Sequence, residues 1–126
     1  MTATVLLIED NEQNRYLATF LLEKSGFTVV SASDGVRGVE LAQSLAPQII
    51  LLEIQLPKFD GYQVARMLRS HDALRPVPIV AVTSYAMSGD RERAMGAGCD
   101  GYIEKPINPD TFVSDVMKYL APDSKG

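Results

Sequence analysis

Three carboxylates, one hydroxyl and one ammonium stand at the ends of apolar segments in this 126-residue sequence. The carboxylates are Glu9, Asp10 and Glu53, the hydroxyl is Thr83 and the ammonium is Lys105. Carboxylate and carbonyl oxygens are the ligands that Mg²⁺ prefers, and a hydroxyl with a cation can stabilise the oxygens of a transferring phosphoryl group. Each residue alone has an ordinary structural explanation, because acids, Thr and Lys-Pro are common where strands end. Together they favour phosphoryl transfer to an acid.

Such a site needs positive charge. Three carboxylates within about 5 Å of one another would repel pairwise by roughly 3 kcal/mol at an effective dielectric constant near 20. A bound Mg²⁺ would offset this repulsion, and Lys105 supplies a second, mobile positive charge.

The segment from Gln48 to Leu52 positions the middle acid. It is apolar without alternation, it leads into Glu53, and Pro57 closes the loop that follows. A run of this kind predicts a strand buried on both faces, in the middle of a parallel sheet.

Four further strands and five helices are predicted around this segment. Apolar or β-branched runs predict strands at residues 5–8, 27–30, 77–82 and 101–104. Capping and turn residues place the helix starts at Asn11, Ser33-Asp34-Gly35, Phe59-Asp60-Gly61, Ser88 and Asn108-Pro109-Asp110. The apolar faces predicted for four helices are Leu17, Phe20 and Leu21; Val36, Val39, Ala42 and Leu45; Val64, Met67 and Leu68; and Phe112, Val113, Val116, Met117 and Leu120.

Five alternating strand-helix pairs predict an α/β fold, a doubly wound (βα)5 parallel sheet with helices on both faces. Ligands of such sheets bind at the C-terminal ends of the strands. We therefore expect the five polar side chains to converge on that edge. We expect one domain over residues 1–121 and a short tail over residues 122–126.

Composition excludes several classes of function. The net charge is -4 and no Lys/Arg cluster occurs, which argues against binding to nucleic acid or to an anionic membrane. The single cysteine, Cys99, excludes an internal disulfide, suits a reducing cytoplasm and is expected to be a buried packing residue. The first apolar segment is too short for a signal peptide or a membrane span.

The sequence resembles a response-regulator receiver domain of the CheY-like kind over essentially its whole length, and within that family it is most similar to single-domain DivK-like regulators. The motifs that carry the resemblance are Leu7-Ile8-Glu9-Asp10-Asn11, Gln55-Leu56-Pro57 with Asp60-Gly61, Val80-Ala81-Val82-Thr83, Ala97-Gly98 with Asp100-Gly101-Tyr102, and Lys105-Pro106. The resemblance implies the flavodoxin-like strand order 2-1-3-4-5.

The resemblance also implies roles for particular residues. Glu9, Asp10 and the backbone carbonyl of Gln55 would bind Mg²⁺, while Thr83 and Lys105 would contact the phosphoryl group. The implied switch and output residues are Ser84, Tyr85 and Tyr102, on a face made of the fourth helix, the last strand and the last helix, and a cis peptide bond is implied before Pro106. The implied partners are a histidine kinase or histidine phosphotransferase and a downstream effector protein.

The sequence departs from the family at its phosphoacceptor, where Glu53 stands in place of aspartate. The extra methylene moves the carboxylate outward by about 1.5 Å, one C–C bond length. Because an error of about 1 Å can slow a reaction about 100-fold, we expect self-phosphorylation to be lost and the protein not to act as an enzyme. The displaced carboxylate could instead engage Lys105 or Thr83 as a partial phosphate mimic, with one charge where phosphate brings about -1.5 to -2.

Three functions stay open at this point. The first is a stand-alone receiver in a two-component phosphorelay that acts through protein-protein interaction. The second is an active phosphotransfer catalyst that uses Glu53 or another acceptor. The third, a flavodoxin-like cofactor binder, is disfavoured because no Gly-rich phosphate loop follows the first strand. We interpret His71, Arg91 and Arg93 as solvated surface residues.

Overall fold

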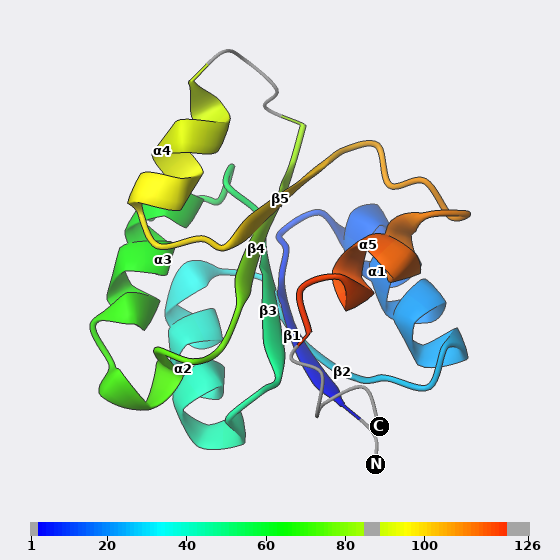
Figure 1. Cartoon of the computed structure of the whole chain (residues 1–126), viewed down its shortest axis with the longest axis horizontal. Coiled ribbons are helices and arrows are strands. Elements are labelled where there is room, and N and C mark those ends of the chain that lie inside the picture. Colours follow the sequence, from blue (N-terminus) through cyan, green and yellow to red (C-terminus); the bar gives the residue numbers. More distant parts are fainter. Residues whose placement is uncertain (1–2, 85–88, 121–126) are drawn as a thin grey trace.

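A computed structural model describes residues 3–84 and 89–120, and within these residues five parallel strands form one sheet between two layers of helices (Figure 1). The strands are β1 (Thr4–Ile8), β2 (Thr28–Ala32), β3 (Ile49–Leu52), β4 (Ile79–Thr83) and β5 (Gly101–Glu104). The helices are α1 (Glu12–Lys24), α2 (Gly35–Leu45), α3 (Gly61–Arg69), the short 3₁₀ helix η1 (Asp72–Leu74), α4 (Asp90–Gly96) and α5 (Phe112–Met117). The sheet order is β2-β1-β3-β4-β5, which confirms the predicted fold class and strand order.

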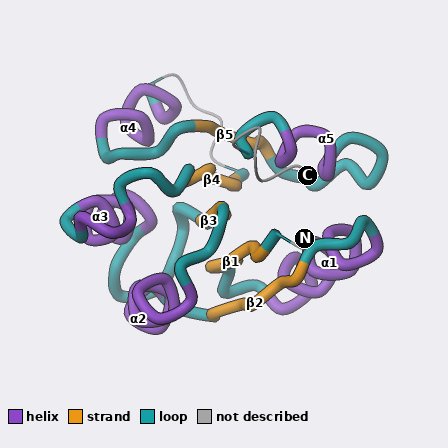
Figure 2. The backbone as a smooth tube through the Cα atoms, turned by 60° about the horizontal axis from the view of Figure 1, so that its bottom comes forward, coloured by secondary structure: helices purple, strands orange, loops and turns teal. Residues whose placement is uncertain are grey.

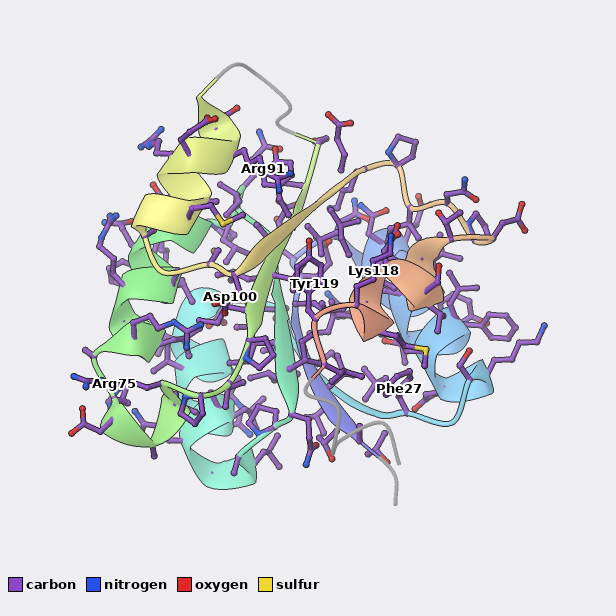
Figure 3. All side chains as sticks on the ribbon, in the orientation of Figure 1. Phe27, Arg75, Arg91, Asp100, Lys118 and Tyr119 are labelled. Carbon is purple, nitrogen blue, oxygen red and sulfur yellow. The ribbon has the colours of Figure 1, made fainter. Side chains whose placement is uncertain are left out.

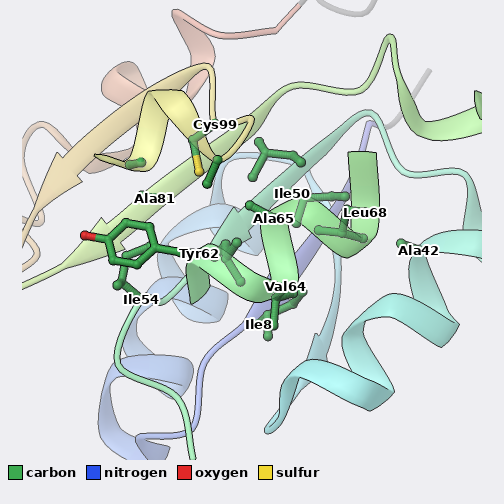
Figure 4. Packing of buried hydrophobic residues seen from close by; sticks show 14 of the residues in the cluster. Ile8, Ala42, Ile50, Ile54, Tyr62, Val64, Ala65, Leu68, Ala81 and Cys99 are labelled. Atoms are coloured by element: carbon green, nitrogen blue, oxygen red, sulfur yellow. The ribbon is translucent and has the colours of Figure 1, made fainter. Parts of the chain in front are cut away.

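The helices divide between the two faces of the sheet. Helices α1 and α5 cover one face, and α2, α3 and α4 cover the other (Figures 1 and 2). Each face has its own hydrophobic cluster: Leu22 and Phe112 belong to the cluster under α1 and α5, and Val64 and Leu68 to the cluster under α2 and α3. Figure 4 shows part of the second cluster, with Cys99 at its α4 end.

Strand β3 is the predicted central strand. Its four residues, Ile49–Leu52, are fully buried, and β3 pairs with β1 on one side and with β4 on the other. Successive side chains of a strand point to opposite faces, so helices on both faces require an apolar residue at every position. This explains the apolar run without alternation that precedes Glu53.

Polar side chains begin three helices at the positions predicted from sequence. Asn11 accepts a hydrogen bond from the backbone N–H of Asn14, and Asp34 accepts one from Arg37. Asp60 and Gln63 form a reciprocal capping box at the start of α3. These caps satisfy N–H groups that would otherwise lack a partner at each helix start.

The predicted inner faces of the helices were wrong at several positions. Phe20 is 51% exposed, while Ala18 and Leu22 supply the buried row of α1. Two residues along a helix correspond to about 200° of rotation, so Phe20 must point away from the sheet when Ala18 and Leu22 face it. Ala18 is too small to mark a buried row in the sequence, so the sequence did not show which side of α1 faces the sheet. Val36, Leu45 and Met117 were likewise predicted to face inward and are exposed.

Two helix starts also differ from the predictions. Asn108 accepts a hydrogen bond from the backbone N–H of Asp110 and its carbonyl accepts two more, so it forms a turn that precedes α5, which begins at Phe112. Ser88, predicted to begin the fourth helix, lies outside the described residues. The described helix α4 follows Gly89 and shows no side-chain cap.

Arg69 connects three segments by hydrogen bonds at the N-terminal edge of the sheet. Its guanidinium donates to Asp100 Oδ2 at 2.6 Å and to the carbonyl oxygens of Gly98 and Leu74. Asp100 lies in the turn between α4 and β5, beside α3 (Figure 3). This network joins α3, η1 and β5 at the edge opposite the strand ends that carry the acids.

No helix within residues 3–84 and 89–120 has both the length and the apolar character needed to cross a membrane. The domain boundary at residue 121 lies outside the described residues and stays a prediction.

Ala46 ends α2 in a left-handed conformation, with φ 48° and ψ 61°. A left-handed conformation costs an L-residue about 1–2 kcal/mol, and glycine avoids this cost. Part of the gain is lost because glycine has more conformational freedom in the unfolded chain. We expect Ala46→Gly to raise the free energy of unfolding by about 0.5 kcal/mol in urea denaturation. Ser44→Gly, two residues earlier and inside the same helix, should lower it by a similar amount. Destabilisation by both variants would contradict the left-handed helix end.

Burial of Cys99, which is 5% exposed, raises the pKa of its thiol to about 11, aided by the nearby carboxylate of Asp100. The thiolate is the reactive form. At a pH below the pKa, each unit by which the pKa rises lowers the fraction of thiolate about tenfold. We therefore expect Ellman's reagent to label the folded protein at pH 8 far more slowly than the urea-unfolded protein. The rate should rise with pH up to about pH 11. Equal rates in both states would show that the thiol is accessible.

Candidate functional site

The C-terminal ends of the strands surround an open cleft of about 470 Å³. The acids Glu9 and Asp10 follow β1, Glu53 follows β3, and Lys105 follows β5. The remaining residues that line the cleft are Asn11, Asn14, Gln55, Ser84 and Pro106. The predicted convergence of Glu9, Asp10, Glu53 and Lys105 on one edge is therefore present in the structure.

Lys105 bridges two buried carboxylates. Its Nζ lies 2.7 Å from Oε1 of Glu9 and 2.5 Å from Oε1 of Glu53. The side chains are 8% exposed for Lys105, 4% for Glu9 and 5% for Glu53. Because all three side chains are more than nine-tenths buried, their ion pairs are stronger than exposed ones, and so is the penalty for leaving any member without its partner.

The second oxygen of each carboxylate is also engaged. Oε2 of Glu53 accepts hydrogen bonds from the backbone N–H groups of Ile54, at 2.6 Å, and Gln55, at 3.1 Å. Oε2 of Glu9 accepts one from Asn11 at 3.1 Å. Every carboxylate oxygen of this buried pair therefore has a donor from the protein itself.

Burial and pairing act in opposite directions on the pKa values of this cluster. Burial would lower the pKa of Lys105, but the hydrogen bonds from its ammonium to Glu53 and Glu9 outweigh burial and raise the pKa above its ordinary value. Burial dominates at Glu9 and raises its pKa, although Lys105 and the N–H of Asn11 oppose it. The raised pKa of Lys105 favours the charged form that bridges the acids.

The loop that holds Glu53 is closed by Gly61. Its N–H donates to the carbonyl of Ile54 at 2.7 Å, which fixes the start of α3 against the end of β3. A Cβ at position 61 would lie 2.5 Å from both the Glu53 carbonyl oxygen and the Ile54 Cα, closer than atoms approach. Only glycine permits this backbone approach, which fixes Ile54 against the start of α3.

The other predicted site residues lie around this cluster in different environments. Asp10 lines the cleft with an exposed side chain, and Thr83 is fully buried at the end of β4. The hydroxyl of Ser84 donates to Oε1 of Gln55 at 3.4 Å. The peptide bond between Lys105 and Pro106 is cis, as the family resemblance implied.

Glu9, one of the expected magnesium ligands, is paired with protein donors in this arrangement. The carboxylate oxygens of Glu9 and Glu53 accept hydrogen bonds from Lys105 and from backbone N–H groups. Among the acids that line the cleft, Asp10 is the one with an exposed side chain.

Tyr102, the predicted switch residue, packs against the cluster under α2 and α3. Its hydroxyl is buried and makes no hydrogen bond within the described residues, and burial raises its pKa. Tyr85 lies outside the described residues. Arg93 is exposed, as predicted, and its guanidinium also lies over the ring of Tyr62, 4.4 Å from the ring centroid. Tyr62 in turn lies beside Ile54 of the Glu53 loop (Figure 4).

Sequence reasoning missed two supporting residues and misjudged a third. Arg15 donates to the carbonyl oxygens of Glu9, at 2.9 Å, and Asp10, and Asn14 lines the cleft. The positions of both on the first turn of α1 could have indicated that they face the acids. His71 is half-buried and contacts the Gln43 amide at 2.7 Å, so it is not a free surface residue.

Comparison with known proteins yields one family. The family model described as the response regulator receiver domain matches residues 5–117. The polar-differentiation response regulators DivK of Brucella ovis and Brucella anthropi are each 40% identical to this chain over 120 residues, which cover 95% of this chain and 98% of each relative.

Solved structures agree with this match. The receiver domain of a sensor histidine kinase from Pseudomonas aeruginosa PAO1, solved with a magnesium ion in its active site cleft, is 32% identical with a TM-score of 0.87, over 94% of this chain and 98% of that one. The chemotaxis protein CheY4 of Vibrio cholerae, at 23% identity, shares the fold with a TM-score of 0.91 over 95% of this chain and all of its own.

Removal of the bridging cation should be costly. Lys105→Met keeps an apolar stem of similar length but leaves two buried carboxylates facing each other, and breaking a buried ion pair typically costs about 3–5 kcal/mol. We expect a loss of that size in urea denaturation at pH 7. Lys118→Met removes an exposed pair with Asp115 and should cost less than about 0.5 kcal/mol. Equal losses in the two variants would contradict a buried bridge.

Proposed function

The chain belongs to the response regulator receiver domain family, and on that premise we propose that it is a signalling receiver held in one state by Glu53. It acts in a two-component phosphorelay by binding other proteins. Receiver domains in such systems interact with histidine kinases and with effectors. We propose a histidine kinase or histidine phosphotransferase and a downstream effector protein as its partners, in the cytoplasm.

The contact between Lys105 and Glu53 carries this proposal. Oε1 of Glu53 lies 2.5 Å from Nζ of Lys105, and Oε2 accepts two backbone hydrogen bonds. A carboxylate must present a free lone pair to attack a phosphoryl donor. Both oxygens of Glu53 already accept hydrogen bonds and the side chain is 5% exposed, so its remaining lone pair cannot reach a phosphoryl donor until the side chain moves.

Glu53 thus replaces the phosphoryl group as the anion that Lys105 contacts. Phosphorylation would bring about -1.5 to -2 charges and three acceptor oxygens, while Glu53 brings one charge and two oxygens. The resulting bias toward the active arrangement is therefore partial. In this proposal Thr83 and Ser84 respond to the anion at position 53, and Tyr85 and Tyr102 report its state on the face formed with α4 and α5.

No step of this function uses a bound metal ion. Asp10 and Gln55 line the cleft, and in this proposal Lys105 is the cation that contacts Glu9 and Glu53.

We expect Glu53→Asp to accept a phosphoryl group and the unaltered protein not to. Aspartate is shorter by about 1.5 Å, so it cannot hold both the Lys105 contact and the two backbone bonds, and an oxygen becomes free to react. Incubation with Mg²⁺ and acetyl phosphate, followed by intact-mass spectrometry, should show one added phosphoryl group only in the variant. Glu53→Gln, which keeps the length and removes the nucleophile, is the control.

Equal labelling of the unaltered protein and Glu53→Asp would reject the proposal and favour the active phosphotransfer catalyst. Labelling of Glu53→Gln would instead reveal a different acceptor residue.

The mimicry itself is tested by amide chemical shifts. For β4, β5 and α5, the spectrum of the unaltered protein should lie closer to that of phosphorylated Glu53→Asp than to that of the same variant without phosphodonor. The opposite order would show that Glu53 silences the receiver rather than activating it.

A further inference from the structure

We propose that the Lys105 ammonium is the permanent counter-ion of the acidic site and that it excludes a divalent metal ion from Glu9 and Glu53. The disagreement between the expected magnesium site and the observed side chains is thus itself a property of this receiver. Its folded state and its interactions would then be independent of Mg²⁺.

The first argument is the allocation of lone pairs. Lys105 Nζ holds one oxygen of Glu9 and one of Glu53, and three backbone N–H groups hold the other two. Water can supply most ligands of a divalent ion, but direct coordination to Glu9 or Glu53 would compete with these donors for the same oxygens and bring the ion beside the ammonium. The displaced donors would lose charge-assisted hydrogen bonds in a site with little access to water.

The second argument is the length of Glu53. With one methylene more than aspartate, its carboxylate reaches Lys105 through Oε1 while Oε2 stays on the N–H groups of Ile54 and Gln55. A shorter acid on the same backbone would have to give up one of these two engagements. The residue that distinguishes this chain from the family pattern is therefore the one that completes the bridge.

The third argument is the charge that is left for a metal ion. The buried cluster of Glu9, Glu53 and Lys105 carries a formal charge of -1, and Asp10 is the exposed carboxylate of the cleft. A divalent ion in the cleft would face one accessible carboxylate and a nearby ammonium that repels it. The four charged groups together carry a formal charge of -2, so the ammonium does not prevent attraction of a divalent ion to the cleft, but it opposes the approach of the ion to Glu9 and Glu53.

This inference shares the Lys105–Glu53 contact with the proposed function, but the two can fail separately. The proposed function is tested by phosphoryl labelling and amide spectra, and the present inference by metal binding without any phosphodonor. A protein that cannot be phosphorylated yet binds Mg²⁺ would overturn only the inference.

Mn²⁺ is the probe, because electron paramagnetic resonance measures its free concentration directly. We expect the unaltered protein to bind Mn²⁺ no better than Lys118→Met, an exposed-lysine control. Glu53→Asp and Lys105→Met should each bind at least about tenfold more tightly, because each frees carboxylate oxygens now held by the ammonium. Asp10→Asn, added to either variant, should abolish the gain and so locate the ion in this cleft.

Thermal unfolding supplies a second readout. In Lys105→Met, Mg²⁺ should raise the melting temperature relative to EDTA because the metal replaces the missing cation, whereas the unaltered protein should melt at the same temperature in both. If Lys105→Met fails to fold, Glu53→Asp carries the test, since it keeps the lysine.

Two results would overturn the inference. The first is Mn²⁺ binding by the unaltered protein with an affinity close to that of Glu53→Asp. The second is a set of variants that all bind as weakly as the unaltered protein, which would show that Lys105 is not what excludes the ion.

Discussion

Two buried carboxylates share one ammonium, and this constraint governs the active edge of the molecule. Glu9 and Glu53 follow two adjacent strands of a parallel sheet, so the fold forces their charges together in a region with little water. Neither acid would be tolerated there as an isolated anion. Lys105, which follows β5, satisfies both, and the position of each of the three side chains therefore depends on the other two.

The scaffold supplies this arrangement with rigid elements. Strand β3 is fully buried between β1 and β4, so the point at which it releases Glu53 is fixed by packing on both faces. The capping box of α3 and the close approach of Gly61 hold the loop that follows, and its N–H groups then bind the carboxylate. The charged cluster is thus positioned by apolar packing below it and by backbone hydrogen bonds around it.

The effect of one methylene can be stated as a population shift. A receiver with an aspartate would exchange between states according to whether an added phosphoryl group engages the lysine, and such a ligand shifts the equilibrium only by its differential interaction with the two states. When Glu53 makes that contact permanently, part of the shift is present without phosphate. The same contact removes both the free nucleophile and the oxygens for a metal ion, so a single side chain accounts for the altered signalling and the altered ion requirement that we propose.

The sequence by itself determined the fold and the membership of the site, because both depend on local patterns: apolar runs that end in acids, capping residues and short connections require a parallel sheet whose strand ends meet at one edge. It did not determine which charges pair. From sequence, Lys105 was a second cation beside a metal ion, whereas in the folded chain it occupies the oxygens of Glu9 and Glu53 and leaves Asp10 in solvent. The sequence also did not show that Phe20 is exposed or that Arg93 stacks on Tyr62. Which charged side chains pair, and which side of a helix faces the sheet, depend on distances of a few ångströms between segments far apart in the chain. Only tertiary packing sets those distances.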